Sequence, residues 1–216
     1  MTVHKTYGQF CGLARALDRV GDRWSLLIVR ELLLEERTFR DLVAALPGIS
    51  PSLLARRLGE LAADRLVERN EAPRRSRNVE YRLTSAGRSL EPAILALIRW
   101  GTVWMLSGPG DDRVDPRWAP LALRALLEGH PSRPGVVHLD IEGIPITINS
   151  LGQTREVLEG HRGVPDATLT LSLPTLLAIT SDSQLLNGAG VEITGNPNVA
   201  RELLTIPHHN GAVTTS

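Results

Sequence analysis

Residues 49–82 constrain the fold of this chain most, because a leucine-periodic segment is followed there by a loop rich in arginine between two short apolar runs. Leu54, Leu58 and Leu61 are spaced four and three apart, so they share one face of a helix. Ser50 and Ser52 flank Pro51 at its start, where serine caps a helix and proline is tolerated. A short strand over residues 66–69, a basic loop over 71–78 and a second strand over 79–83 follow. The order predicts a winged helix-turn-helix, in which the helix fits a DNA major groove and the loop lies on the adjacent backbone.

The residues before this run strengthen the interpretation. A short helix is predicted over residues 39–45 with Thr38 as its N-cap, and Pro47 and Gly48 then interrupt the helix in a tight turn. Each part alone has an ordinary explanation, because a leucine-periodic helix is usually plain core and loop arginines are usually solvated. Helix, turn, helix and basic hairpin in succession favour the DNA-binding hypothesis.

Eight side chains are the candidate DNA contacts. Four are expected to face the major groove and four to lie on phosphate or in the minor groove; in order, they are Ser50, Ser52, Arg56, Arg57, Arg74, Arg75, Arg77 and Asn78. The division of charge agrees with this assignment. Residues 1–107 hold 17 basic and 12 acidic residues, a net +5, whereas residues 108–216 hold 7 and 12, a net −5. Only the first half is therefore expected to meet a polyanion.

Length and composition indicate two domains in a cytoplasmic protein. At 216 residues the chain exceeds the usual size of one domain, and its glycine-, proline- and acid-rich stretch after residue 107 is typical of a linker. We expect a DNA-binding and dimerisation domain over residues 1–107, a linker over 108–117, an α+β domain over 118–207 and a tail over 208–216. We find no secretory leader or membrane span, and the single cysteine fits a reducing compartment.

Two apolar helices are expected to hold a homodimer. One helix is predicted over residues 7–20. The other is predicted as a single long helix over residues 85–107, in which Thr84 is the N-cap and apolar residues form a stripe: Leu90, Ile94, Leu97, Ile98, Gly101 and Trp104. Such a stripe can pack on its own domain or on a second copy. We favour the second copy, because a two-fold dimer supplies the two half-sites that a small DNA reader needs.

The second half alternates apolar and polar residues with a period of two, which is typical of strands. A hairpin turn is expected at Glu142 and Gly143, and helices over residues 118–128, 174–180 and 198–204. The fold class is therefore α+β, with a mostly antiparallel sheet covered on one face by helices. Six residues are expected on the covered face, where they either line a pocket for a small apolar ligand or fill one another's space: Leu139, Ile141, Ile146, Ile148, Leu169 and Leu171.

No catalytic or metal-binding constellation is found in the sequence. The six histidines form no pair at ligand spacing with cysteine or carboxylate, and the chain has no nucleophile elbow, P-loop or dinucleotide fingerprint. We therefore expect neither an enzyme nor a cofactor or metal. Cys11 is the one reactive candidate: Arg15, one helical turn along, could favour its thiolate, although a lone cysteine is more often a small buried side chain.

The N-terminal half resembles the HxlR-type winged-helix regulators of bacteria. The resemblance spans about residues 7–105 and is most specific at Gly21–Trp24 (GDRW) and at Tyr81–Gly87 (YRLTSAG). It implies a cytoplasmic, dimeric, DNA-binding protein whose recognition helix is residues 50–64 and whose wing tip is residues 71–78. In some relatives the cysteine at the position of Cys11 senses oxidants or electrophiles.

The C-terminal half resembles the sterol-carrier-protein-like fold through PDATLTLSLPTLLAIT at residues 165–180 and VEITGNPNVARELL at residues 191–204. This resemblance implies an apolar binding pocket. Taken together, the sequence predicts a homodimeric transcriptional regulator, a repressor, that binds an inverted-repeat operator and senses an apolar ligand through its second domain. The alternative is a ligand-carrier or protein-interaction module whose winged helix no longer binds DNA.

Overall fold

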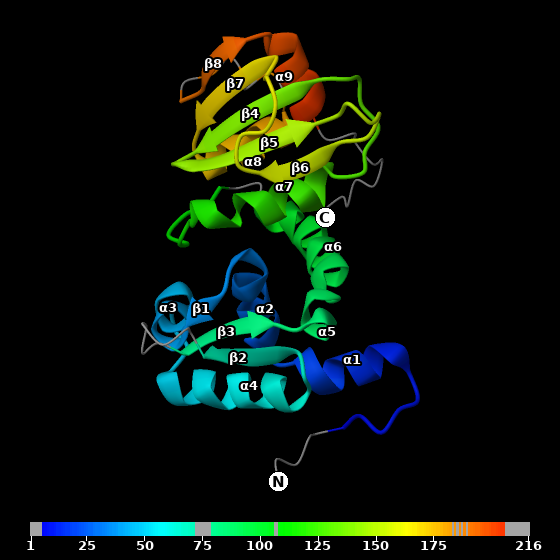
Figure 1. Ribbon diagram of the computed structural model, residues 1–216, viewed down its shortest axis with the longest axis vertical. Coiled ribbons are helices and arrows are strands. Elements are labelled where there is room, and N and C mark those ends of the chain that lie inside the picture. Colours follow the sequence, from blue (N-terminus) through cyan, green and yellow to red (C-terminus); the bar gives the residue numbers. More distant parts are fainter. Residues whose placement is uncertain are drawn as a thin grey trace, which may run out of the picture. The chain divides into compact units, whose positions relative to one another are not determined.

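Figure 1 shows the computed structural model, which describes residues 6–71, 79–105, 108–182, 184, 186, 188 and 190–205. The chain divides into two compact units, residues 1–94 and 95–216. The division falls inside helix α6 (Glu91–Gly101), whereas the sequence placed the end of the first domain at residue 107. No helix in the described part of the chain is both long and apolar enough to cross a membrane.

The N-terminal unit combines helices with a small three-stranded sheet. Its strands lie in the order β1-β3-β2, and both pairings are antiparallel. The elements are α1 (Gly12–Val20), α2 (Ser25–Leu34), β1 (Arg37–Thr38), α3 (Phe39–Ala45), α4 (Pro51–Ala63), β2 (Val67–Glu71), β3 (Val79–Leu83) and α5 (Ser85–Arg88). The predicted helix-turn-helix and hairpin are thus present, with β1 as an added third strand.

Capping residues fix where the two central helices begin. Thr38 and Asp41 form a reciprocal capping box at the start of α3, in which each side chain accepts a hydrogen bond from the other's backbone N–H. The hydrogen bond from the Thr38 side chain holds the pKa of Asp41 below its ordinary value. Ser50 caps α4 by accepting from the Leu53 amide at 3.2 Å, and Pro51 occupies the first turn. Both predicted starts are confirmed.

Apolar burial sets the rotation of α4. Leu54, Leu58 and Leu61 lie on its buried face, and at most 3% of any of the three is exposed. Figure 1 shows α4 running alongside β2. The leucine stripe predicted from the sequence is therefore the face that α4 turns to the core.

The single helix predicted over residues 85–107 is wrong. The structure has α5 (Ser85–Arg88), then α6 (Glu91–Gly101), and then a 3-10 turn, η1 (Thr102–Met105). Pro92 explains the break, because proline has no N–H to donate and its ring would clash with the carbonyl of Arg88, four residues earlier in a continuous helix. Pro92 is instead accommodated in the first turn of a new helix, where the missing N–H has no partner to lose.

The C-terminal unit is a mixed five-stranded sheet with helices on one face. The strand order is β6-β5-β4-β7-β8; β4 and β7 are parallel, and the other neighbours are antiparallel. Its elements from the 3-10 turn η2 onward are η2 (Pro116–Trp118), α7 (Ala119–Leu127), β4 (Val136–Ile141), β5 (Ile144–Asn149), β6 (Glu156–Glu159), β7 (Ala167–Leu171), α8 (Leu173–Ser181), β8 (Glu192–Gly195) and α9 (Pro197–Leu204). The predicted α+β class is confirmed, and β6 is a strand that the sequence prediction missed.

The β4–β5 hairpin has the predicted turn. Glu142 and Gly143 have φ of 52° and 87°, the two positive values that a type I′ turn requires. The turn sets a register that pairs Leu139 with Ile146 and His138 with Thr147. Alternate residues therefore face opposite sides, so the first pair meets the helices and the second lies on the other face.

The segment from β6 to β7 crosses that second face, and hydrogen bonds attach it there. The ring of His138 bonds through Nε2 to the carbonyl oxygen of Arg162 at 3.0 Å, and Thr147 donates to the carbonyl of Gly160 at 2.8 Å. His161 stacks on His138 with ring centroids 4.4 Å apart. These two histidines therefore have a structural role in closing the parallel crossover.

Gly87 should tolerate no side chain. A Cβ there would lie 2.1 Å from the carbonyl oxygen of Leu66, a backbone atom at the start of the hairpin. We expect Gly87→Ala to lower the free energy of unfolding by about 1–3 kcal/mol, as overpacking does. Gly59 on α4 is the matched control, because a Cβ there meets nothing within 4 Å. Gly59→Ala should stabilise the protein by about 0.5–1 kcal/mol through helix propensity. Urea unfolding followed by circular dichroism measures both, and equal shifts would contradict the assignment.

Candidate nucleic-acid interface

The turn between α3 and α4 depends on a glycine. Gly48 has a φ of 91°, a conformation that costs other residues strain, and the amide of Ile49 donates to the carbonyl of Leu46 at 3.2 Å. A Cβ built at Gly48 would lie 3.8 Å from the Trp24 ring, so the start of α2 packs beneath the turn. These contacts fix the angle at which α4 leaves α3.

The outward face of α4 is built from small side chains. Ser52, Ala55 and Gly59 are exposed at intervals of three and four residues, opposite the buried leucines. The hydroxyls of Ser50 and Ser52 lie 3.2 Å apart at the helix start. Glycine in a helix interior costs stability, and the fold places nothing near Gly59 that would require it. A face of this kind lets the helix backbone approach another surface closely.

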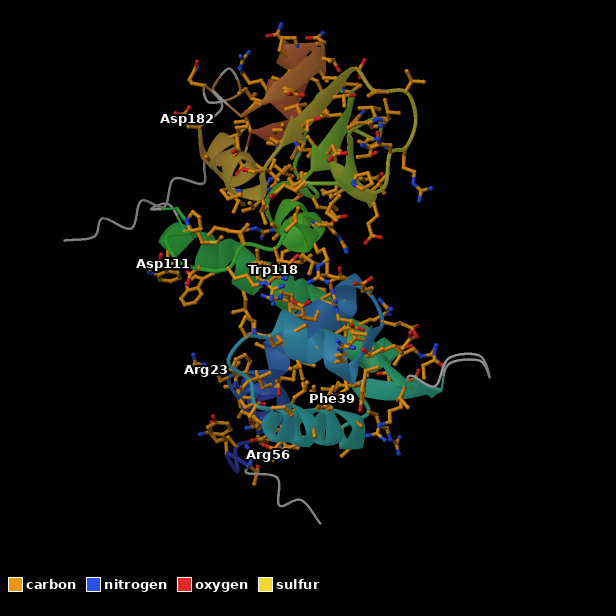
Figure 2. All side chains as sticks on the ribbon, turned by 90° about the vertical axis from the view of Figure 1, so that its left-hand side faces the viewer. Arg23, Phe39, Arg56, Asp111, Trp118 and Asp182 are labelled. Atoms are coloured by element: carbon orange, nitrogen blue, oxygen red, sulfur yellow. The ribbon has the colours of Figure 1, made fainter. Side chains whose placement is uncertain are left out.

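The structure separates the two adjacent arginines of α4. Arg56 is exposed (Figure 2) and makes no hydrogen bond or ion pair with any residue that the structure describes. Arg57 is half-buried and lies between two carboxylates: its Nε is 3.0 Å from Oδ1 of Asp22, and its Nη1 is 2.5 Å from Oε2 of Glu60. Arg56 is therefore free to meet a ligand, whereas Arg57 already has intramolecular partners.

Charge pairs and a cation–π contact join the described strands of the hairpin. Arg82 on β3 pairs with Glu68 on β2 at 2.8 Å, and Arg69 lies over the Tyr81 ring at 5.5 Å from its centroid. The four remaining candidates, in the loop between the strands, lie outside the described residues: Arg74, Arg75, Arg77 and Asn78. The structure thus describes the base of the predicted wing.

Two charged residues of the N-terminal unit were missed by the sequence analysis. Arg40 is exposed in the first turn of α3, where the Thr38–Asp41 capping box places it. Its position could have been inferred from that box, so it joins the candidates for contact with an anion. Asp22 is the second, as the partner of Arg57. No spacing rule links residues that are 35 positions apart, so only the structure reveals this pair.

The six predicted pocket residues lie together in the C-terminal unit. All are on the helix-covered face of the sheet and none is more than 4% exposed: Leu139, Ile141, Ile146, Ile148, Leu169 and Leu171. They form one hydrophobic core with residues of α7, α8 and α9, including Leu123, Leu176 and Leu203. The structure therefore gives all six a packing role.

Cys11 lies at the N-terminal end of α1 and is exposed. The backbone N–H groups of Ala14 and Leu13 favour its thiolate and lower the pKa of the thiol below its ordinary value. Arg15, the neighbour considered from the sequence, instead pairs with Asp18 at 3.5 Å. The lowered pKa thus comes first from the helix N-terminus, whose amides stabilise a negative charge.

Alkylation of Cys11 should therefore begin at a lower pH in the folded protein than in the urea-unfolded chain. The thiolate is the reacting form, so the rate with iodoacetamide follows its ionisation. The helix amides that favour it exist only in the folded state, so unfolding should raise the midpoint of the pH–rate curve. Because Cys11 is the single cysteine, the protein needs no background substitution. Identical midpoints in the two states would contradict this prediction.

The comparisons with known proteins agree with this geometry. The model of the HxlR-like helix-turn-helix family matches residues 19–108. An uncharacterised HTH-type transcriptional regulator of Synechocystis, sll1512, is 34% identical over 98 residues, which cover 45% of this chain and 73% of that protein. The uncharacterised HTH-type regulator YvaP of Bacillus subtilis is 36% identical over 91 residues, 42% of this chain and 84% of that protein.

Among solved structures, the reduced form of the redox regulator HypR is 30% identical and covers 43% of this chain and 92% of its own, with a TM-score of 0.41. Both sequence relatives are HTH-type transcriptional regulators. The family match ends at residue 108, so it concerns the region that contains α4 and the hairpin. With helix, turn, helix and hairpin in place, the chain belongs to the HxlR-like helix-turn-helix family of transcriptional regulators.

Proposed function

We propose that this protein is a cytoplasmic repressor that binds an inverted-repeat DNA operator as a homodimer, with α4 in the major groove. The observation that carries the proposal is the exposed face of α4. Its side chains are small, and Arg56 stands among them without an intramolecular partner in the described part of the chain. A helix must approach base edges closely to read them, and an unpaired guanidinium suits a bidentate contact with guanine. Ser50 and Ser52 lie at the N-terminal end of the same helix.

Charge supports the same assignment. The net +5 of residues 1–107 includes the exposed Arg40 and Arg56 as well as the loop arginines predicted to lie on phosphate. Neutralising phosphates releases condensed counterions, so a protein that binds in this way is sensitive to salt. The rival function, a carrier or protein-interaction module that no longer binds DNA, predicts no such sensitivity.

Two exposed apolar surfaces support the dimer. Phe10, Leu13 and Leu17 are exposed along α1 and the segment before it. In the other unit, Leu97, Trp100 and Trp104 are exposed on α6 and η1, and the two tryptophan rings pack edge to face with centroids 4.5 Å apart. Large apolar side chains clustered at a surface are typical of an interface. We infer that a second copy covers both.

A role for the C-terminal unit as a sterol-carrier-like ligand sensor stays a prediction. Its six predicted pocket residues are packed between the sheet and the helices, so an apolar ligand would have to open that core. A ligand regulates DNA binding only if it binds the competent and incompetent states with different affinity.

DNA affinity should fall steeply with salt. With about six phosphate contacts in a dimer, the logarithm of the association constant should fall with log salt at a slope of about −5. The duplex to use is the one selected from a random library.

Arg56→Met should relax base preference at one position of each half-site, at a cost of about 1–3 kcal/mol for a good base contact. Arg133→Met removes an exposed arginine from the C-terminal unit and is the control. It should change neither the salt slope nor the base preference. Failure of the wild-type protein to bind any duplex would refute the proposed function.

Leu13→Glu should convert the dimer into a folded monomer. Leu13 is 68% exposed in one protomer, so a charge there leaves the core intact, but in a dimer it would be buried without a partner. Leu151→Glu is the matched control, because Leu151 is 65% exposed but lies in a loop of the C-terminal unit. Sedimentation velocity reports the assembly state and circular dichroism reports the fold. If the Leu13→Glu protein stays dimeric, the dimer interface does not include this face of α1.

A further inference from the structure

We propose that the α1–α2 junction is a positioning device that fixes α4 through two ion pairs, Asp22–Arg57 and Arg19–Asp64, so that Arg57 and Asp64 orient the recognition helix without touching DNA. The inference rests on the proposed DNA-binding function and assigns Arg57 a different role from the base contact expected from the sequence.

The first pair has a rigid anchor. Oδ1 of Asp22 accepts hydrogen bonds from the amides of Trp24 at 2.9 Å and Ser25 at 3.3 Å, and its Oδ2 accepts from the Ser25 hydroxyl. These bonds satisfy the first turn of α2 and hold the carboxylate in one place. Arg57 lies between this carboxylate and a second one on its own helix. Its Nε is 3.0 Å from Oδ1 of Asp22, and its Nη1 is 2.5 Å from Oε2 of Glu60. The middle of α4 is thereby tied to the start of α2.

The second pair joins the end of α4 to the end of α1. Nη1 of Arg19, in the last turn of α1, lies 2.6 Å from Oδ1 of Asp64, the C-cap of α4. Arg57 and Asp64 are seven residues apart, which is about two turns or about 10 Å of helix. Two attachments this far apart on one helix hold it at one position along its axis and refine the rotation that the buried leucines set.

The polarity of the two pairs specifies one register. The junction offers an anion to Arg57, and α1 offers a cation to Asp64. If α4 were reversed or shifted so that the partners were exchanged, Arg19 would meet Arg57 and Asp22 would meet Asp64. Like charges in contact are penalised, so the arrangement selects against the wrong placement as well as favouring the right one.

Gly21 keeps the junction between α1 and α2 short enough for both ion pairs to form. A Cβ at residue 21 would lie 2.5 Å from the carbonyl oxygen of Leu17, so only glycine allows α1 to end here and the charged residues near it to reach α4 together. Elsewhere on α1, Leu13 and Leu17 are exposed and form part of the surface proposed for the dimer. The junction therefore transmits the placement of the dimer helix to α4, and so determines the spacing between two recognition helices.

The spacing of the operator half-sites tests this role directly. One added or removed base pair moves a half-site by about 3.4 Å and rotates it by about 35°. The wild-type protein should lose about tenfold or more in affinity on such duplexes. In Arg57→Met and Asp22→Asn that loss should fall to about threefold, because a loosely held α4 can follow the displaced site. The amide oxygen introduced by Asp22→Asn would still accept the hydrogen bonds from the α2 backbone. Arg57→Lys, which keeps the charge, should recover most of the discrimination.

Arg56→Met is the matched control on the adjacent position, and it should alter base preference while leaving the spacing discrimination as in the wild type. For the second pair, Asp64→Arg should weaken the discrimination and the exchanged double variant Arg19→Asp with Asp64→Arg should restore it. An Arg57→Met protein that loses preference for one base yet keeps the wild-type response to spacing would show that Arg57 contacts DNA, and would overturn the proposal.

Amide hydrogen exchange tests, in the absence of DNA, whether the two ion pairs hold α4 in place. The amides of α4 should exchange several-fold faster in Arg57→Met and Asp22→Asn than in the wild type or Arg56→Met, while those of β4 in the other unit stay unchanged. Wild-type exchange of α4 in all variants would overturn the positioning role. If no duplex binds the wild-type protein but α4 exchanges faster in the two variants, the DNA-binding function fails and the positioning of α4 stands.

Discussion

The N-terminal unit depends on the burial of three leucines from one helix. Each of Leu54, Leu58 and Leu61 contributes about 1.5–3 kcal/mol when removed from water, which is large beside the net stability of a domain. Because a helix repeats about every 3.6 residues, burying this face also determines the opposite one. Ser52, Ala55, Arg56 and Gly59 are exposed because the leucines are not. The surface assigned to DNA is thus set by the core, and the charge pairs at the α1–α2 junction only refine its orientation.

The elements that could be predicted from the sequence are those whose signals are local. Thr38 and Asp41 are three residues apart, and their reciprocal hydrogen bonds fix the start of α3 wherever the rest of the chain lies. The Glu142–Gly143 turn is equally local, because its two positive φ values select residue types within one tight turn. The long helix was wrong for a reason that was also local: Pro92 forbids a continuous helix, and the apolar periodicity on both sides concealed it. Here the steric rule outweighs the pattern.

The remainder could not be predicted, because it depends on residues that are far apart in the chain. Arg56 and Arg57 offer DNA the same guanidinium group, but helical spacing places Arg57 beside the buried leucines, where Glu60 of the same helix also pairs with it. Its second partner could not be predicted, because Asp22 lies 35 residues earlier and only the fold brings it within 3.0 Å of Arg57. Likewise β6, only four residues long, is a strand because β5 offers it a partner, and a segment so short has little periodicity of its own. The sequence thus predicted α4 as a helix, whereas its contacts with DNA stay predictions.

Helix α6 shows why an apolar pattern alone does not identify an interface. Its sequence is apolar on more than one side, so periodicity could not say which side meets a second copy. The predicted stripe includes Ile94, which is 4% exposed within one protomer and so is already covered. Trp100 and Trp104, in contrast, are 66% and 64% exposed and pack against each other. Two exposed tryptophans leave a large apolar area in water, and burying it in a dimer recovers the hydrophobic free energy that the protomer forgoes. We therefore expect the proposed dimer interface to follow the side chains that a single chain leaves uncovered, and those are the side chains with which the proposed dimer is tested.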